Sequence, residues 1–315
     1  MFGRRRWHPL IRGVLVAAVT VGAVAGCATS RPASSGGPDG GKVAVVAAEN
    51  FWGSIAAQLG GERVSVRSVI SNPDADPHDY EPTAADGRTV ASARYVITNG
   101  AGYDPWVAKL VAANPPSTLP SRTVLTVGDL VGVPQGGNPH RWYSPADVHR
   151  VVERMTTDYQ KIDPADAGYF EQRKQAFETQ SLARYDQLVT DIRTRYAGTP
   201  IGASESIVTP LAEGLGLTLR TPESFLDAIS EGTDPTAADK STVDEQIRDK
   251  QIAVYLYNSQ NATPDVKAQV DAATAAGIPV ATVTETQVPE TATFQDWQVA
   301  QLQRIEQALA RATGR

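Results

Sequence analysis

The stretch Val43-Ala-Val-Val-Ala-Ala48 decides how the folded part of this chain is interpreted. It is a continuous run of small and β-branched apolar residues, bounded by glycine and lysine before it and by polar residues after it. Uninterrupted runs of this kind are typical of strands buried on both faces, and helices cover both faces of a sheet when its strands are parallel. The sequence therefore predicts a parallel sheet at the start of the folded chain.

Further strand and helix patterns alternate along the rest of the chain. The expected strands are Val64–Ile70, Tyr95–Thr98, Val124–Val127, Ile201–Ala203, Ile252–Tyr257 and Pro279–Val283. The expected helices include Trp52–Leu59, Thr83–Ser92, Pro105–Ala113, Val208–Leu215, Pro264–Ala276 and Thr293–Ala312. Regular alternation of strands and helices is the signature of an α/β fold with parallel sheets.

One long helical pattern lies between the two groups of strands. Asp163 and Pro164 supply an N-cap and a proline in the first turn, and Gly198 and Pro200 end the helix. About 32 residues at roughly 1.5 Å each give a rod of about 50 Å, which is longer than a small domain is wide. A coiled-coil dimerisation helix is the alternative, but it requires a stricter heptad repeat.

The length of 315 residues suits two lobes. We predict an α/β protein with two parallel-sheet lobes, residues 42–162 and 198–315, joined by one spine helix over residues 163–197. We expect it to be a monomer. The net charge of -6 and the pI near 5.3 leave no basic surface for nucleic acid, so we expect no nucleic-acid partner.

The first 41 residues have the features of an export signal followed by a lipid anchor and a tether. Residues 1–26 combine a basic region, Arg4 to Arg6, with an apolar run that is too short to span a bilayer, as in a signal peptide. The sequence Val24-Ala-Gly-Cys27 resembles the lipobox of bacterial lipoproteins, which implies lipidation of Cys27 and a flexible tether over residues 27–41. A signal peptide with an incidental cysteine is the alternative, and the Sec and Tat routes both stay open. We expect lipid anchoring at the extracytoplasmic face of the cell membrane.

Two loops each present a histidine directly after a proline: Asp76-Pro-His-Asp-Tyr-Glu-Pro82 and Asn138-Pro-His-Arg-Trp-Tyr-Ser-Pro145. Proline restricts the backbone, so the rings of His78 and His140 can be held in one direction, as a metal site requires. Each loop alone could be an ordinary turn. Both loops follow predicted strands, and ligands bind at the carboxyl ends of strands in open α/β sheets.

Two carboxylates follow strands of the second group, Glu205 after Ile201–Ala203 and Glu285 after Pro279–Val283. Imidazoles with carboxylates suit zinc, manganese or ferrous iron, whereas calcium prefers six to eight oxygen ligands. We therefore predict one divalent metal held by His78, His140, Glu205 and Glu285. Alternatively, Glu205 caps the following helix and Glu285 is a surface residue.

These motifs resemble the metal-binding lipoproteins of bacterial ABC transporters for zinc and manganese, from about Lys42 to the C-terminus. The matching parts are the two Pro-His loops, Asp163-Pro164 and Ala203-Ser-Glu-Ser206. The resemblance implies that His78, His140 and Glu205 are ligands, whereas the usual fourth ligand, an aspartate, is here replaced by Glu285. It also implies a receptor without enzymatic activity that hands its metal to an ABC permease and its ATPase.

Two rival interpretations come from other classes of protein. A lipid-anchored metallohydrolase would use His78, His140 and Glu205 as ligands and Glu285 as general base. A receptor or adhesin for another ligand, such as a siderophore, could also use two lobes joined by a stiff helix.

Overall fold

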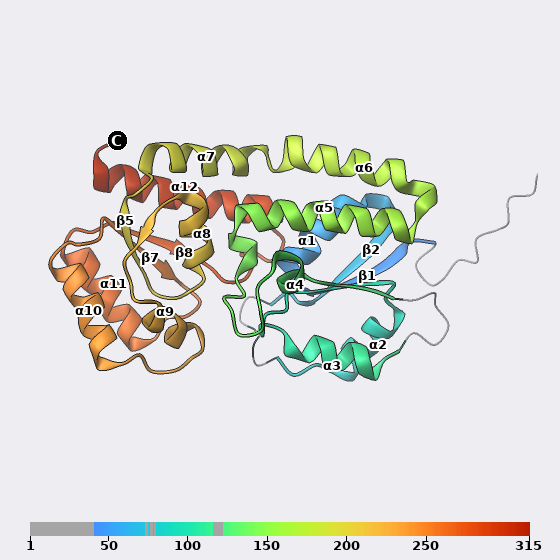
Figure 1. Cartoon of the computed structure of the whole chain (residues 1–315), viewed down its shortest axis with the longest axis horizontal. Coiled ribbons are helices and arrows are strands. Elements are labelled where there is room, and N and C mark those ends of the chain that lie inside the picture. Colours follow the sequence, from blue (N-terminus) through green and yellow to red (C-terminus); the bar gives the residue numbers. More distant parts are fainter. Residues whose placement is uncertain (1–40, 73–74, 76–77, 79, 116–121) are drawn as a thin grey trace, which may run out of the picture. The chain divides into compact units, whose positions relative to one another are not determined.

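A computed structural model describes residues 41–315, apart from residues 73–74, 76–77, 79 and 116–121 (Figure 1). The predicted signal peptide, Cys27 and nearly all of the tether lie outside the described residues. Among the described helices, none combines the length and apolar character that crossing a membrane requires.

The first sheet has four parallel strands in the order β2-β1-β3-β4. They are β1 (Val43–Glu49), β2 (Val64–Ile70), β3 (Tyr95–Thr98) and β4 (Thr123–Thr126). In register, Val45 of β1 pairs with Val66 of β2 and with Tyr95 of β3. The apolar run that predicts this sheet is thus one of its two inner strands.

Helices cover both faces of the first sheet. On one face, Val45 and Ala47 pack in a cluster with residues of α1 (Asn50–Gly60), and on the other, Val46 and Ala48 pack with residues of α2 (Ala84–Ser92) and α3 (Pro105–Ala113). Successive strand residues point to opposite faces, so a strand covered on both sides needs an unbroken apolar sequence.

The second sheet repeats this topology, with four parallel strands in the order β6-β5-β7-β8. They are β5 (Pro200–Ala203), β6 (Thr218–Leu219), β7 (Val254–Asn258) and β8 (Val280–Val283). Its helices are α8 (Val208–Leu215), α9 (Glu223–Ser230), α10 (Ala237–Arg248), α11 (Pro264–Ala275) and α12 (Phe294–Thr313). The sequence interpretation missed β6, α9 and α10. The predicted α/β class with two parallel-sheet cores is confirmed, while the lobe boundaries stay a prediction.

The predicted spine is a succession of helical segments. After α5 (Pro145–Ile162) come a 3-10 turn (Pro164–Asp166), α6 (Ala167–Ala176), a π-helical turn (Phe177–Ser181) and α7 (Ala183–Tyr196). The Leu182 N–H donates to the Phe177 carbonyl at 2.8 Å, which is the i to i+5 bond of a π-helix. The buried residues Phe177 and Leu182 are five positions apart, so the wider turn keeps both side chains on the buried side.

The helical succession contacts elements around both sheets. Helix α6 packs against α1 and α5, whereas α7 packs against α8 and α12 (Figure 1). One cluster of buried apolar side chains extends from β1 through α7 to α12. The two sheets therefore share a continuous apolar core.

Candidate metal centre

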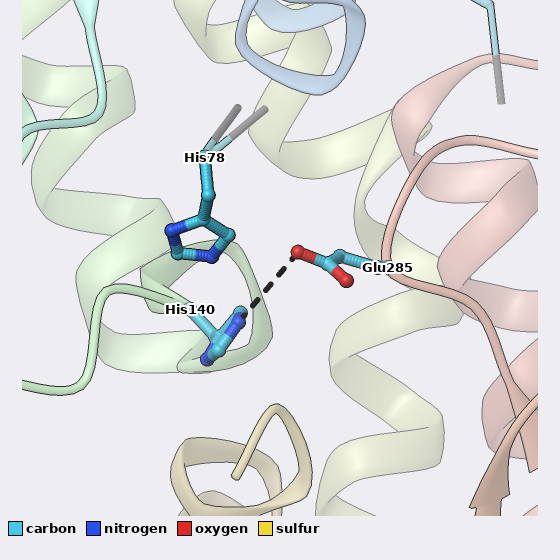
Figure 2. Close-up of side chains that lie close together, drawn as sticks. All are labelled: His78, His140 and Glu285. Atoms are coloured by element: carbon cyan, nitrogen blue, oxygen red, sulfur yellow. Dashed lines mark ion pairs between the residues drawn. The ribbon is translucent and has the colours of Figure 1, made fainter. Parts of the chain in front are cut away.

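Three of the four predicted ligands lie together: His78, His140 and Glu285 (Figure 2). Each offers one ligand-type atom, and these atoms all lie within 4.8 Å of one another. The closest ion pair among them joins His140 Nε2 and Glu285 Oε1 at 3.8 Å. His78 follows β2, His140 precedes the 3-10 turn Arg141–Tyr143, and Glu285 follows β8, so both sheets contribute.

Neighbouring polar groups orient the imidazole of His140. Asn138 Oδ1 accepts the backbone N–H of His140 at 3.1 Å and lies 2.9 Å from its Nδ1. An amide oxygen is an acceptor, so the ring proton is on Nδ1, and Nε2 faces Glu285. The Asn99 side chain donates to the carbonyl of Pro139 at 2.9 Å and fixes the residue before the histidine.

Tyr103, which the sequence interpretation did not select, lies against all three residues. Its hydroxyl donates to Glu285 Oε1 at 2.9 Å. Its ring centre lies 4.7 Å from that of His78 and 5.9 Å from that of His140, both edge to face. The sequence offered one signal for Tyr103. It is a tyrosine that closely follows the predicted strand Tyr95–Thr98, in a segment that contains glycines.

The residue before Glu285 is held by three hydrogen bonds. The Tyr143 hydroxyl donates to the Thr284 carbonyl at 2.7 Å. The Thr284 N–H donates to Gln301 Oε1 at 2.7 Å, and the Trp297 indole donates to Thr284 Oγ1 at 2.8 Å. Because Tyr143 follows His140 by three residues, it ties the His140 loop to the Glu285 loop.

Two opposing effects act on the Glu285 carboxyl group, whose side chain is 20% exposed. Burial raises its pKa, but the nearby imidazole of His140, the hydrogen bond from Tyr103 and the nearby imidazole of His78 lower it. The net result is a pKa below the usual glutamate value. Glu285 is therefore kept ionised, as a metal ligand must be.

Glu205 lies outside this cluster. It is fully buried, and its two oxygens accept hydrogen bonds from the side-chain amides of Asn258 and Asn261, the latter at 2.8 Å. Asn258 ends β7, and Asn261 lies in the following loop. Amide donors stabilise the ionised carboxylate.

The cluster opens onto a cavity of about 1040 Å³. Four carboxylates line it, from Glu285 and from Glu223, Asp227 and Glu231 in and after α9, while none of its described lining residues is lysine or arginine. Burial, together with the charges of Glu223 and Glu231, raises the pKa of Asp227. A cavity wall of one sign concentrates ions of the opposite sign, so this cavity favours cations.

Two parallel α/β sheets are joined by a long helical connection, and ligand-type residues come from both sheets. Residues 45–308 match the family model ZnuA, described as "Zinc-uptake complex component A periplasmic". The chain therefore belongs to this family.

Curated relatives of this chain are named for the metals they bind. The chain is 26% identical over 171 residues to the "Manganese-binding lipoprotein MntA" of Halalkalibacterium halodurans, covering 53% of this chain and 54% of that protein. It is 25% identical to the "Zinc-binding lipoprotein AdcA" of Streptococcus pneumoniae, covering 65% and 43%. The chain thus spans about half the length of these relatives or less.

A solved structure of similar fold is the "Mn-bound periplasmic metal binding protein" from Candidatus Liberibacter asiaticus. The TM-score is 0.69 at 20% identity, and the match covers 85% of this chain and 99% of that one. At this identity the likeness supports the fold alone.

Proposed function

We propose that this protein is an extracytoplasmic solute-binding protein that captures one divalent transition-metal ion, zinc or manganese, and delivers it to an ABC permease. The cluster of His78, His140 and Glu285 carries this proposal. Imidazole and carboxylate together suit these ions, and the orientation of His140 leaves Nε2 available as a ligand. The carboxylate-lined cavity favours a cation over an anionic ligand.

The family and the names of the relatives support the same function. Relatives of this chain are called manganese-binding and zinc-binding lipoproteins. We propose by analogy a lipid anchor at Cys27, a place at the outer face of the cell membrane, and a permease with its ATPase as partners. We also propose that the protein acts as a monomer.

We retain Glu205 as the proposed fourth ligand. Its carboxylate is buried and held by two amide donors, and its neighbour Ser206 lines the same cavity as the cluster. Two carboxylates would balance the charge of one divalent ion, which lowers the cost of burying it.

Metal titration of single variants tests the ligand set. Zinc and manganese affinities of chelator-treated protein are measured for wild type, His140→Ala, Glu285→Gln and Glu205→Gln. Loss of a ligand should weaken binding by at least about 100-fold, because removing even an outer partner costs about 10- to 100-fold. Unchanged affinity in Glu285→Gln would overturn the cluster as the metal site.

Glu231→Gln is the matched control for this titration. Glu231 is exposed and lines the same cavity, but it is not part of the cluster. Removal of an exposed charge has little effect on binding, so the affinity should change by less than about threefold.

Acid should weaken metal binding, because protons compete with the metal for the imidazole nitrogens of His78 and His140. We expect weaker zinc binding at pH 5.5 than at pH 7.5, and His140→Ala should lose part of this difference. Equal affinities at the two pH values would remove the histidines from the site.

The metallohydrolase interpretation has one observation in its favour. The described residues gather three ligand-type side chains, and three is the usual number of protein ligands in catalytic zinc sites. Zinc-loaded wild type and His140→Ala are compared for ester and peptide hydrolysis. A receptor gives no difference in turnover, whereas hydrolysis that depends on His140 would favour the enzyme. Elemental analysis and native mass spectrometry of the purified protein distinguish a metal from an organic ligand.

A further inference from the structure

Glu49 is a fully buried carboxyl group that the metal centre does not use. It ends β1 and precedes α1, and neither of its carboxylate oxygens accepts a hydrogen bond from the described residues. Burial raises its pKa well above the usual glutamate value, and the charge of Asp104 raises it further. An ionised carboxylate in such a place would be strongly unfavourable.

Asp104 is the neighbouring carboxyl group, and it is surrounded by donors. It accepts hydrogen bonds from the Thr98 hydroxyl, from the Asn99 N–H at 2.7 Å and from the Gly100 N–H at 2.7 Å. Three donors favour the ionised form of Asp104, although its burial still raises its pKa. The charge of the pair is therefore concentrated on Asp104.

Among the described residues, the groups that face this pair offer Glu49 no cationic partner. In register, Ile70 of β2 lies beside Glu49, and the nearby Thr98 and Asn99 at the end of β3 are neutral. Within the described part of the chain, Asp104 is the titratable group that acts on Glu49. Both residues stand at helix N-termini, those of α1 and α3, where the positive helix dipole disfavours a bound cation. A proton satisfies the pair where a metal ion would not.

We propose that Glu49 retains its proton at neutral pH and donates it to Asp104, so that the two carboxyl groups share one proton behind the candidate metal centre. One proton between two buried carboxyl groups avoids two adjacent negative charges. The pair titrates as a unit.

The shared proton holds a turn that reaches the metal centre. Asp104 binds the first three residues of the segment Thr98–Asp104. Within that segment, Asn99 donates to the carbonyl of Pro139, and Tyr103 donates to Glu285. Ala101 has a φ of 55°, a left-handed conformation that a non-glycine residue adopts only when its surroundings impose it. Glu49 and Asp104 are thus positioning residues.

The pH dependence of stability tests the proposal without any metal, so its failure is distinguishable from failure of the proposed function. The folded protein binds the Glu49 proton above the unfolded glutamate pKa of about 4.3, whereas the unfolded chain releases it. The contribution of this proton to stability is complete below the unfolded glutamate pKa. It is lost as the pH rises through the raised pKa of Glu49 in the folded protein. In this window the folding constant of wild type should fall about tenfold per pH unit relative to Glu49→Gln.

Glu49→Gln keeps a hydrogen-bond donor toward Asp104 but has no titratable proton. Its folding constant should therefore not show this fall with rising pH. Exposed Glu213→Gln in α8 is the control and should keep the wild-type slope. Glu49→Ala should be less stable than Glu49→Gln at every pH, because it lacks the donor. Parallel profiles of wild type and Glu49→Gln would overturn the proposal.

Infrared spectroscopy of the wild type at neutral pH is independent of whether the variants fold well. We expect the carbonyl band of a protonated carboxyl group, absent in Glu49→Gln and present in Glu213→Gln. A wild-type spectrum without that band would also overturn the proposal.

Discussion

Tyr103 connects the three clustered residues, because its hydroxyl binds Glu285 and its ring lies against both histidines. Tyr103→Phe keeps the ring and removes the hydrogen bond that orients the carboxylate. We expect metal affinity to fall by about 10- to 100-fold, as for other partners of metal ligands. Calorimetric titration with zinc measures the effect.

Tyr169→Phe in α6 is the control for Tyr103→Phe. The Tyr169 hydroxyl accepts the backbone N–H of Glu62 in an exposed contact outside the cluster. Its removal should leave zinc affinity unchanged. Equal affinities of Tyr103→Phe and wild type would show that the Tyr103 hydroxyl does not position Glu285.

At the scale of single elements, α8 meets the start of α5 at Gly214. A Cβ built on Gly214 would lie 2.5 Å from Cδ of Pro145, whose ring cannot move aside. Alanine in a helix gains up to about 1 kcal/mol over glycine, but overpacking costs about 1–3 kcal/mol. Gly214→Ala should therefore lower the free energy of unfolding, by about 1 kcal/mol, in urea titrations.

Gly168→Ala in α6 is the matched control, and its expected change in the free energy of unfolding has the opposite sign. A Cβ at Gly168 would meet no atom within 4 Å, so only the helix propensity changes. We expect a gain of about 0.5 kcal/mol in the free energy of unfolding. If both alanine variants gained stability, the contact between α8 and α5 would be looser than described.

A titratable contact joins α5 and α7, in which His149 Nε2 lies 2.9 Å from Asp186 Oδ1. The hydrogen bond to Asp186 raises the pKa of His149, burial opposes it, and the charges of Asp186 and Glu178 raise it further. The stabilisation is therefore complete below the unfolded pKa of about 6.5 and is lost as the pH rises through the folded value.

Asp186→Asn tests this contact by urea unfolding at several pH values. Both side chains are more than one third exposed, so the wild type should exceed the variant by less than about 1 kcal/mol at pH 5.5. The difference should vanish at pH 9. A difference independent of pH would mean that the contact does not depend on the charge of His149.

At the scale of the whole molecule, the continuous apolar core connects both sheets. We expect scanning calorimetry to show a single cooperative unfolding transition, because neither sheet can unfold without exposing side chains that the other buries. Zinc at 100 times its dissociation constant should add about 2.7 kcal/mol and leave one transition. Two separate transitions would show that the lobes unfold independently.

Much of the fold could be predicted from local sequence. The bounds of Val64–Ile70, Tyr95–Thr98 and Val208–Leu215 agree with the structure, because apolar runs and helix signals act over a few neighbouring residues. The short strand β6 could not be predicted, because two residues are too few to show an alternation of apolar and polar side chains. The π-helical turn was missed because the five-residue spacing of Phe177 and Leu182 has meaning only against the core that buries both.

The sequence by itself determined the parallel sheets and the types of residue available for a metal, because these follow from local apolar patterns and side-chain chemistry. Tertiary structure decided which of those residues meet. It gathers Glu285 with His78 and His140 while Glu205 binds Asn258 and Asn261. It also brings Tyr103 to Glu285 and Glu49 to Asp104. These partners lie far apart in the chain, and only the packing of strand ends and helices defines the distances between them.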